Sequence, residues 1–236
     1  MFIGHPAIAF AAKRVAPRTS LGVLMAAALL PDLIWPVLIL AGVERVRIDP
    51  GNTAFTPLAF DYYPFSHSLA ISLALAAIVG AVYWRWTHHV TGAWVVGACV
   101  FSHWILDWSS HRSDVPIAPG LSAHVGLGLW NSVPATMIVE LTLFAVGVWL
   151  YTRTTRTKGP AGLWSLWSLV AVLVLIYLSN IFGPSPPSAQ AVAWVGIASW
   201  LFPFWATWVD RERIAISRKD RERLSRAHAA PISRSN

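Results

Sequence analysis

Phe101-Ser102-His103-Trp104-Ile105-Leu106-Asp107-Trp108-Ser109-Ser110-His111 closes a long apolar segment and carries three side chains that can bind a metal ion. His103 and Asp107 are four residues apart, so a helix places them on one face, one turn apart. His111 extends the same face by a further turn. Ionisable side chains inside a lipid-embedded helix are costly and usually functional. This segment therefore predicts a helix that contributes to a polar site inside an apolar protein.

The composition is that of a membrane protein that crosses the bilayer several times. Of the 236 residues, 56% are hydrophobic and only 12% are charged, with 14 Trp and a mean hydropathy of +0.54. Soluble domains carry about 25% charged residues, so a soluble protein is excluded in practice. The single cysteine, Cys99, cannot form an internal disulfide. No cleavable signal peptide is expected, because Lys13, Arg14 and Arg18 follow the first apolar segment instead of preceding it.

Six apolar segments are long enough to span a bilayer of about 30 Å. They cover about residues 20–42, 67–84, 92–109, 134–151, 163–182 and 190–209. Only the first is expected to be interrupted, by Pro31-Asp32 and Pro36. We predict an all-α polytopic bundle of about six transmembrane helices plus a short N-terminal half-helix. It forms one domain over residues 1–210, with a metal-site half over about 1–150, two further helices over 163–209, and a basic tail over 211–236.

The distribution of positive charge predicts the orientation of the bundle. Of the 18 Lys and Arg residues, 15 lie in residues 1–19, 85–91, 152–162 and 210–236, and 3 lie in the alternate loops. Positive residues remain on the cytoplasmic side, so we expect both termini in the cytoplasm of a bacterium and the protein in its inner membrane. The net charge of +7 therefore indicates membrane orientation and not nucleic-acid binding. Near residues 211–226 the tail is either a solvated segment or a surface helix attracted to anionic lipid.

Polar residues from different spans are expected at one depth in the membrane. At ~1.5 Å per residue from the nearest cytoplasmic marker, Asp32 and His103 lie ~18 Å deep, Glu140 ~20 Å, Asp107 ~24 Å and His67 ~27 Å. All five therefore fall in the outer half of the bilayer.

His5 has two possible placements. A half-helix over residues 5–14 would raise it ~13 Å into the bundle, whereas residues 2–12 could instead lie on the cytoplasmic surface.

Each of these residues also has an ordinary structural explanation. His67 can cap a helix together with Ser66, Asp32 can accept from amides freed by a proline kink, and Glu140 can pair with Arg112. Their convergence favours a metal instead, since the spans hold almost no basic residue to balance the carboxylates. Mixed histidine and aspartate ligands suit zinc, as one or two ions.

Four motifs in order resemble those of the YdjM-like membrane-bound metal-dependent hydrolases. They are Gly4-His5, Leu29-Leu30-Pro31-Asp32, Phe65-Ser66-His67-Ser68-Leu69 and Ser102-His103-Trp104-Ile105-Leu106-Asp107. That family in turn resembles the zinc-dependent phospholipases C, which are helical enzymes with clustered zinc ions. The resemblance covers about residues 1–150. It implies a metal site lined by His5, Asp32, His67, His103 and Asp107, with His5 inside the bundle.

The chain departs from that family at two places. The extra charged residues that often flank the second and third motifs are replaced by Leu33-Ile34-Trp35 and Tyr63-Pro64-Phe65, so support of the ligands from those places is expected to be absent. A second zinc in a phospholipase-like site would need a His-x-x-x-Glu pair, but Gly128 follows His124 at that spacing. The residues left for a possible second metal site are His111, Asp114, His124 and Glu140.

These features predict hydrolysis through a metal-activated water, on a phosphoester of a lipid or a lipid-linked substrate. Asp32 would be the general base or a bridging ligand. Arg112 and Asn131 would bind substrate, with residues 123–131 as a lid. Two other functions remain open: a divalent-cation or proton transporter that uses the same residues, and a membrane scaffold with a structural metal. The expected partners are membrane lipids and exclude nucleic acid, and the oligomeric state is not predicted.

Overall fold

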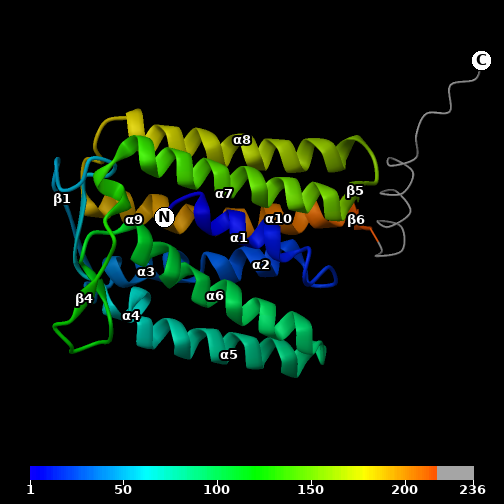
Figure 1. Cartoon of the computed structure of the whole chain (residues 1–236), viewed down its shortest axis with the longest axis horizontal. Helices are drawn as coiled ribbons and strands as arrows, with labels where there is room; N and C mark the ends of the chain where they lie inside the picture. The colour runs from blue at the N-terminus through cyan, green and yellow to red at the C-terminus, as the bar shows by residue number, and fades with distance from the viewer. Residues whose placement is uncertain (217–236) are drawn as a thin grey trace, which may run out of the picture.

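Long apolar helices form the frame of the protein, seen in a computed structural model that describes residues 1–216 (Figure 1). Five helical segments are long and apolar enough to cross a membrane. They are α5 (Leu69–Thr87), α6 (Val90–Ser110), α7 (Val133–Thr154), α8 (Pro160–Phe182) and the combined segment Ala189–Arg211. The bent pair α2 (Leu21–Ala28) and α3 (Leu30–Leu40) makes a sixth if it is counted as one span. The all-α membrane bundle predicted from the sequence is confirmed, and each span begins and ends within three residues of its expected limits.

The first span is broken where the sequence predicts it. The axes of α2 and α3 differ by 53°, with Leu29 between the two helices. Pro31 in the first turn of α3 has no N–H to continue the ladder of the preceding helix. The bend places Asp32 in the first turn of α3, deep in the bundle.

The last span, Ala189–Arg211, is a single segment without a bend of more than 40°, so the expectation that only the first span is broken is confirmed. Its helix is irregular only at Ser199 and Trp200, between α9 (Ala189–Ala198) and α10 (Leu201–Arg211). Pro203 explains this irregularity, because its ring has no N–H and clashes with a carbonyl four residues earlier, that of Ser199. The first and last spans lie side by side, with α9 packed on α3 and α10 packed on α2.

The N-terminal helix α1 (Gly4–Ala12) lies inside the bundle, where it packs on α7, α2 and α6. His5 is only 1% exposed, and Ile3, Ala9 and Phe10 are completely buried. Of the two placements that the sequence leaves open, the structure has the inserted one. Gly147 of α7 permits the close approach, because a Cβ there would meet the backbone of Ala7.

Short strand pairs, which the sequence interpretation did not predict, close both ends of the bundle (Figure 1). At one end β1 (Arg45–Ile48) pairs with β2 (Leu58–Tyr62), and β3 (Val115–Pro116) pairs with β4 (His124–Val125). The short helices α4 (Pro64–His67) and η1 (Leu129–Asn131) belong to the same connections. At the opposite end β5 (Thr155–Thr157) pairs with β6 (Arg213–Ala215), so the tail expected from residue 211 starts with a strand. The remainder of the helix hypothesis for residues 211–226 falls mostly outside the described residues.

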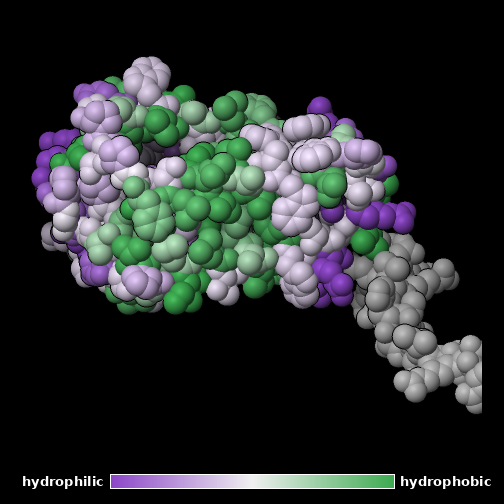
Figure 2. Space-filling view, turned by 90° about the horizontal axis from the view of Figure 1, so that it is seen from above, coloured by the Kyte–Doolittle hydropathy of each residue, from purple (hydrophilic) through white to green (hydrophobic). Residues whose placement is uncertain are grey.

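The surface has the pattern of an integral membrane protein. On the face that Figure 2 shows, hydrophobic residues form a belt across the middle of the bundle, and hydrophilic residues gather toward its two ends. Large apolar side chains are exposed within the belt, among them Leu175 of α8 and Val195 of α9. Such a belt is stable when lipid tails cover it, because their burial removes apolar surface from water.

Candidate metal centre

Five side chains from four helices converge on one buried point. His5 comes from α1, Asp32 from α3, His67 from the end of α4, and His103 and Asp107 from adjacent turns of α6. Two overlapping groups, His5–His103–Asp107 and Asp32–His67–His103, each hold ligand atoms within 4.8 Å of one another. The residues that the four motifs indicate are thus brought together in space, although residues 5 and 107 are far apart in the chain.

The carboxylates of Asp107 and Asp32 lie between the imidazole rings. His5 Nε2 is 3.2 Å from Asp107 Oδ1, and His103 Nε2 is 3.1 Å from Asp107 Oδ2. His67 Nε2 is 3.4 Å from Asp32 Oδ1 and 3.7 Å from Asp107 Oδ2. These spacings are those of donor atoms that share a common neighbour, and this polar cluster could hold a metal ion.

Two of the histidines are oriented by bonds through Nδ1. His103 Nδ1 lies 2.8 Å from the Ala28 carbonyl, which the bend after α2 leaves available. A carbonyl can only accept, so Nδ1 carries the hydrogen and the lone pair of a neutral ring is on Nε2. His67 Nδ1 lies 2.6 Å from Ser66 Oγ, so its Nε2 also points to the carboxylates. Both rings therefore present a metal-binding nitrogen to the centre of the cluster.

Three buried nitrogens of the cluster make no hydrogen bond. His5 Nδ1 is one of them, and His5 Nε2 and His103 Nε2 lie close to Asp107 oxygens without the geometry of a hydrogen bond. The rings of His5 and His103 are stacked with centroids 3.6 Å apart and planes 5° apart. A buried nitrogen without a partner costs free energy, and two stacked imidazolium cations would repel each other. Neutral rings whose nitrogen lone pairs bind a cation remove both costs, so the residues present fit a metal ion.

The charge of the cluster is only partly balanced by the protein. The amino group of Met1 lies 2.5 Å from Asp107 Oδ1 and 3.0 Å from Ser110 Oγ. Among the ion pairs of residues 1–216, those of Asp32 are with His67 and His103, and no Lys or Arg takes part. A divalent cation would complete the balance of the two carboxylates.

Glu44 supports the cluster from outside, a role that the sequence interpretation missed. Ser66 Oγ donates to Glu44 Oε2 at 2.6 Å and accepts from His67, so a chain of hydrogen bonds runs from Glu44 to the ligand ring. Glu44 also accepts from the amides of Phe65 and Ser66 at the start of α4. The expectation that the ligands lack such support holds only for the positions beside the motifs. The signal in the sequence was a lone acidic residue at the start of the loop between the first two spans, 22 residues before Ser66.

The four residues considered for a second metal do not meet at one place. Glu140 Oε2 accepts from the amides of Phe2 (2.8 Å) and Gly4 (3.2 Å), and so caps the N-terminus of α1. His124 is exposed on β4, with Nδ1 2.8 Å from the carbonyl of Ser122. His111 and Asp114 pair with each other at 3.1 Å. Within residues 1–216, both groups of side chains that could hold a metal ion belong to the cluster around Asp107 and Asp32.

His111 belongs to an aromatic wall beside the cluster. Its ring lies 4.2 Å from that of Trp130 and 4.8 Å from that of Phe60, centroid to centroid. The Tyr63 hydroxyl is 3.3 Å from both His111 Nδ1 and Asp114 Oδ1. Burial raises the pKa of the Tyr63 hydroxyl well above its usual value, and the Asp114 charge adds to this effect. Tyr63 therefore remains protonated and can donate a hydrogen bond at this wall.

The predicted substrate-binding residues lie at the surface, and neither lines the cavity beside the cluster. Arg112 is exposed and its Nε donates to Asp114 Oδ2 at 3.2 Å. Asn131 is exposed at the end of η1, while the neighbouring Trp130 is buried. The segment 123–131 expected to act as a lid contains β4 and η1, and Trp130 is the part of it that reaches the cavity beside the cluster.

A cavity of about 380 Å³ reaches the cluster, and Asp32, His67 and Asp107 line its inner end. Asp32 is the more accessible of the two carboxylates, with 36% of its side chain exposed against 4% for Asp107. The rest of the wall is mainly apolar and comes from α8, α9 and α10 and from the N-terminus, α3, the β1–β2 hairpin and the wall of His111 and Trp130. The cluster is thus open to a ligand on one side and closed by protein on the others.

Comparison with known proteins adds no relative to this description. No protein-family model matches the chain, and neither a curated protein nor a solved structure matches it. On its own structure, the chain is a helical membrane protein with a buried His/Asp cluster that could hold a metal ion.

Proposed function

We propose that the protein is a membrane-embedded, metal-dependent hydrolase that cleaves a phosphoester in a lipid or lipid-linked substrate. One observation carries the proposal: four buried metal-competent side chains and the partly exposed Asp32 converge beside a cavity that Asp32, His67 and Asp107 line. A structural metal site is closed by its ligands, whereas a catalytic site keeps one side open. The cavity beside Asp32 favours the catalytic kind over a scaffold.

The residues divide naturally by their exposure. His5, His67, His103 and Asp107 are almost completely buried, so they would hold the metal. A bound zinc ion supplies Lewis acidity, which lowers the pKa of water and polarises a phosphoryl oxygen. Asp32 faces the cavity and would take the proton of the attacking water, or bridge two ions if two are bound. Its position in the first turn of α3 fixes the direction of the carboxylate.

We infer a lipid-like substrate from the apolar character of the cavity that leads to the cluster. Within residues 1–216, the apolar cavity walls belong to helices in the hydrophobic belt. Arg112 and Asn131 are exposed near the aromatic wall of His111 and Trp130, and would offer a cation and an amide to a phosphate group outside the cavity. The resemblance to YdjM-like hydrolases, and through them to zinc-dependent phospholipases C, supports the same reaction class. We place the protein in a bacterial inner membrane with the ends of the chain in the cytoplasm.

Metal content and headgroup release test the proposal together. Purified protein should retain zinc, and His103→Ala and Asp107→Ala should lose it, whereas the control His88→Asn should not. His88 is exposed at the other end of the bundle and has φ of 52°, a conformation that Asn adopts readily. The metal-loaded protein should then release headgroups from one member of a phospholipid panel. Metal that survives both cluster substitutions would refute the site.

Transport of a divalent cation or a proton is a second candidate, favoured by the broken first span, whose second half carries Asp32. Discontinuous helices at the membrane midplane are typical of transporters. Zinc flux into proteoliposomes without headgroup release would support transport. Headgroup release without flux would support the hydrolase.

A further inference from the structure

We propose that the cavity between α8 and the last span α9–α10 binds one hydrocarbon chain of the substrate, which enters sideways from the bilayer. This inference rests on the proposed function, because it names the kind of molecule that the cluster acts on. It also assigns a role to the last helices, which contribute no ligand to the cluster.

The chemistry of the cavity wall selects a hydrocarbon chain. Val172 and Ile176 of α8 face Val192 of α9 and Phe202 and Trp205 of α10 across the cavity. Polar side chains are few between these apolar walls, so a peptide or a sugar would lose its hydrogen bonds to water without compensation. A hydrocarbon chain loses none, and each buried methylene adds to binding.

The size of the cavity indicates one chain. A volume of about 380 Å³ lies at the lower end of the range for small-molecule sites, roughly 300–1,000 Å³. At ~30 Å³ for a group the size of a water molecule, it holds on the order of a dozen such groups. This is the scale of part of one acyl or alkyl chain, not of the paired chains of a whole phospholipid.

The cavity opens toward the lipid within the hydrophobic belt. Val195 and Leu201 line it and are also 68% and 63% exposed. They lie on either side of the irregularity at Ser199 and Trp200, where α9 gives way to α10. α9 packs on α3, whereas α8 packs on α10, so α8 and α9 form opposite sides of the opening. Lipid tails surround this opening, and they are the hydrocarbon available to fill it.

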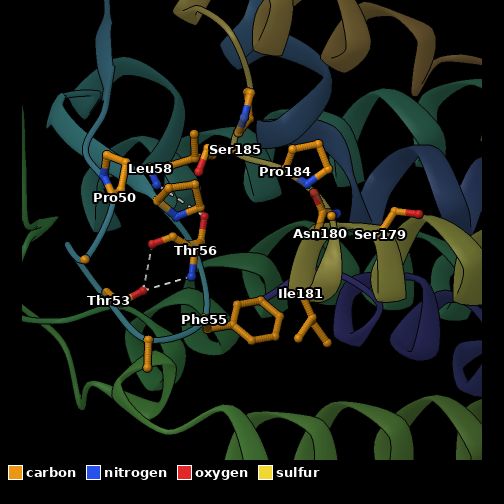
Figure 3. A pocket seen from close by; sticks show the side chains of 15 residues that line it. Pro50, Thr53, Phe55, Thr56, Leu58, Ser179, Asn180, Ile181, Pro184 and Ser185 are labelled. Atoms are coloured by element: carbon orange, nitrogen blue, oxygen red, sulfur yellow. Dashed lines mark hydrogen bonds between the residues drawn. The ribbon is translucent and has the colours of Figure 1, made fainter.

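A smaller pocket marks the polar end of the same path. Figure 3 shows residues of the β1–β2 connection, including Thr53, Phe55 and Thr56, opposite Asn180 in the last turn of α8 and Ser185 just after that helix. This pocket is about 230 Å³ and shares Phe55, Thr56, Leu58 and Asn180 with the larger cavity. Its polar lining residues are uncharged.

The direction of the path is that of a lipid in the membrane. Asn180 lies at the end of the bundle that carries β1 and β2, and Val172 lies two turns deeper, ~12 Å along α8. A chain between α8 and α10 would therefore point toward the bilayer centre, while its polar group lies near the cluster and the loops. This is the orientation of a lipid in the leaflet on the side of those loops.

Filling the cavity tests the proposal. Val172→Trp and Ile176→Trp each place an indole in the chain path, whereas Leu175→Trp places it on the same helix, facing lipid, with Leu175 62% exposed and not part of the cavity wall. A substrate series with one headgroup and chains of increasing length is then compared. Wild-type kcat/KM should rise by up to about fourfold per added methylene until the cavity is full. The two cavity variants should lose this dependence and retain activity on the shortest substrate.

A binding measurement separates this proposal from the proposed function. An alkylphosphocholine with a photoreactive diazirine at its chain end should crosslink to α8 and α10 in wild-type protein and in Leu175→Trp. In Val172→Trp and Ile176→Trp, crosslinking should fall by about tenfold or more. Crosslinking without hydrolysis of any substrate would refute the hydrolase and leave the chain site supported. Equal crosslinking in all four proteins, or its restriction to other helices, would refute the chain site.

Discussion

At the residue scale, the hydroxyl of Ser66 is expected to influence how tightly the candidate site binds a metal ion. It links Glu44 to His67, so it sets which nitrogen of His67 carries the hydrogen. Ser66→Ala should lower zinc affinity by about tenfold to a hundredfold, because supporting residues of metal ligands have effects of this size. Zinc titration of the metal-free protein against a chelator measures it.

Ser72 offers a matched control for that experiment. It is another fully buried serine, on α5, and its Oγ has no hydrogen-bond partner. Ser72→Ala should leave zinc affinity unchanged. If both substitutions weaken zinc equally, Ser66 acts through packing alone and the orienting role fails.

Glu140 can be tested as a cap against its alternative role as a ligand. Glu140→Ala leaves the amides of Phe2 and Gly4 without an acceptor, and should lower the free energy of unfolding by about 1–2 kcal/mol. Glu140→Gln keeps an acceptor oxygen and should be milder. Thermal unfolding of the metal-free proteins measures the difference. Loss of a bound zinc equivalent in Glu140→Gln would instead support the second metal site.

The ligand set shows how much of the site could be predicted from residues alone. His103 and Asp107 are related by helix geometry, and their depth could be compared with that of His67 and Asp32 through the helical rise. Depth gives no rotation about the helix axis, so Glu140 was placed at the right level but without its contacts. The role of Glu44 was not predicted, because Glu44 precedes the β1–β2 hairpin and its partner Ser66 follows it. The pairing of these strands cannot be deduced from depth in the membrane.

At the scale of the element, α1 is the part whose position the site depends on most. Gly147 lets α1 approach α7, and the neighbour of an added Cβ would be backbone, which cannot rotate away. Gly147→Ala should therefore shift α1, displace His5 and destabilise the protein by about 1–3 kcal/mol. Zinc content and the melting temperature should fall together.

Gly159 provides the comparison, because a Cβ there meets nothing within 4 Å. Its φ of 179° is extended backbone that any residue adopts. Gly159→Ala should keep full zinc content. Normal zinc binding by Gly147→Ala would show that His5 is dispensable to the site.

Element boundaries followed closely from hydropathy, since a long apolar run must be helical to satisfy its backbone in lipid. The irregularity between α9 and α10 could not be predicted, although Pro203 lies just after it. A proline inside a span is compatible with a kinked helix or with a short irregular segment. The terminal strand pairs were also missed. Each has only two to five residues per strand, too short for an alternating pattern to be visible.

At the scale of the whole molecule, the charge bias predicts which end faces the cytoplasm. Cys99 is buried and is the only cysteine, so Cys99→Ser gives a cysteine-free protein into which single cysteines can be introduced for labelling. Ser122→Cys should react with a membrane-impermeant maleimide added outside intact cells. Arg156→Cys should react only after the membrane is opened. Labelling of the two positions in the reverse order would invert the proposed orientation.

The β5–β6 pair closes the last third of the chain into a loop. These strands fasten the end of α10 to the connection between α7 and α8, and Thr155 pairs with Ala215. All of α8, α9 and α10 therefore lies within a segment whose two ends are held together by backbone hydrogen bonds. The entropy cost of closing a flexible loop rises only slowly with its length, so a short strand pair can hold even a segment of this size.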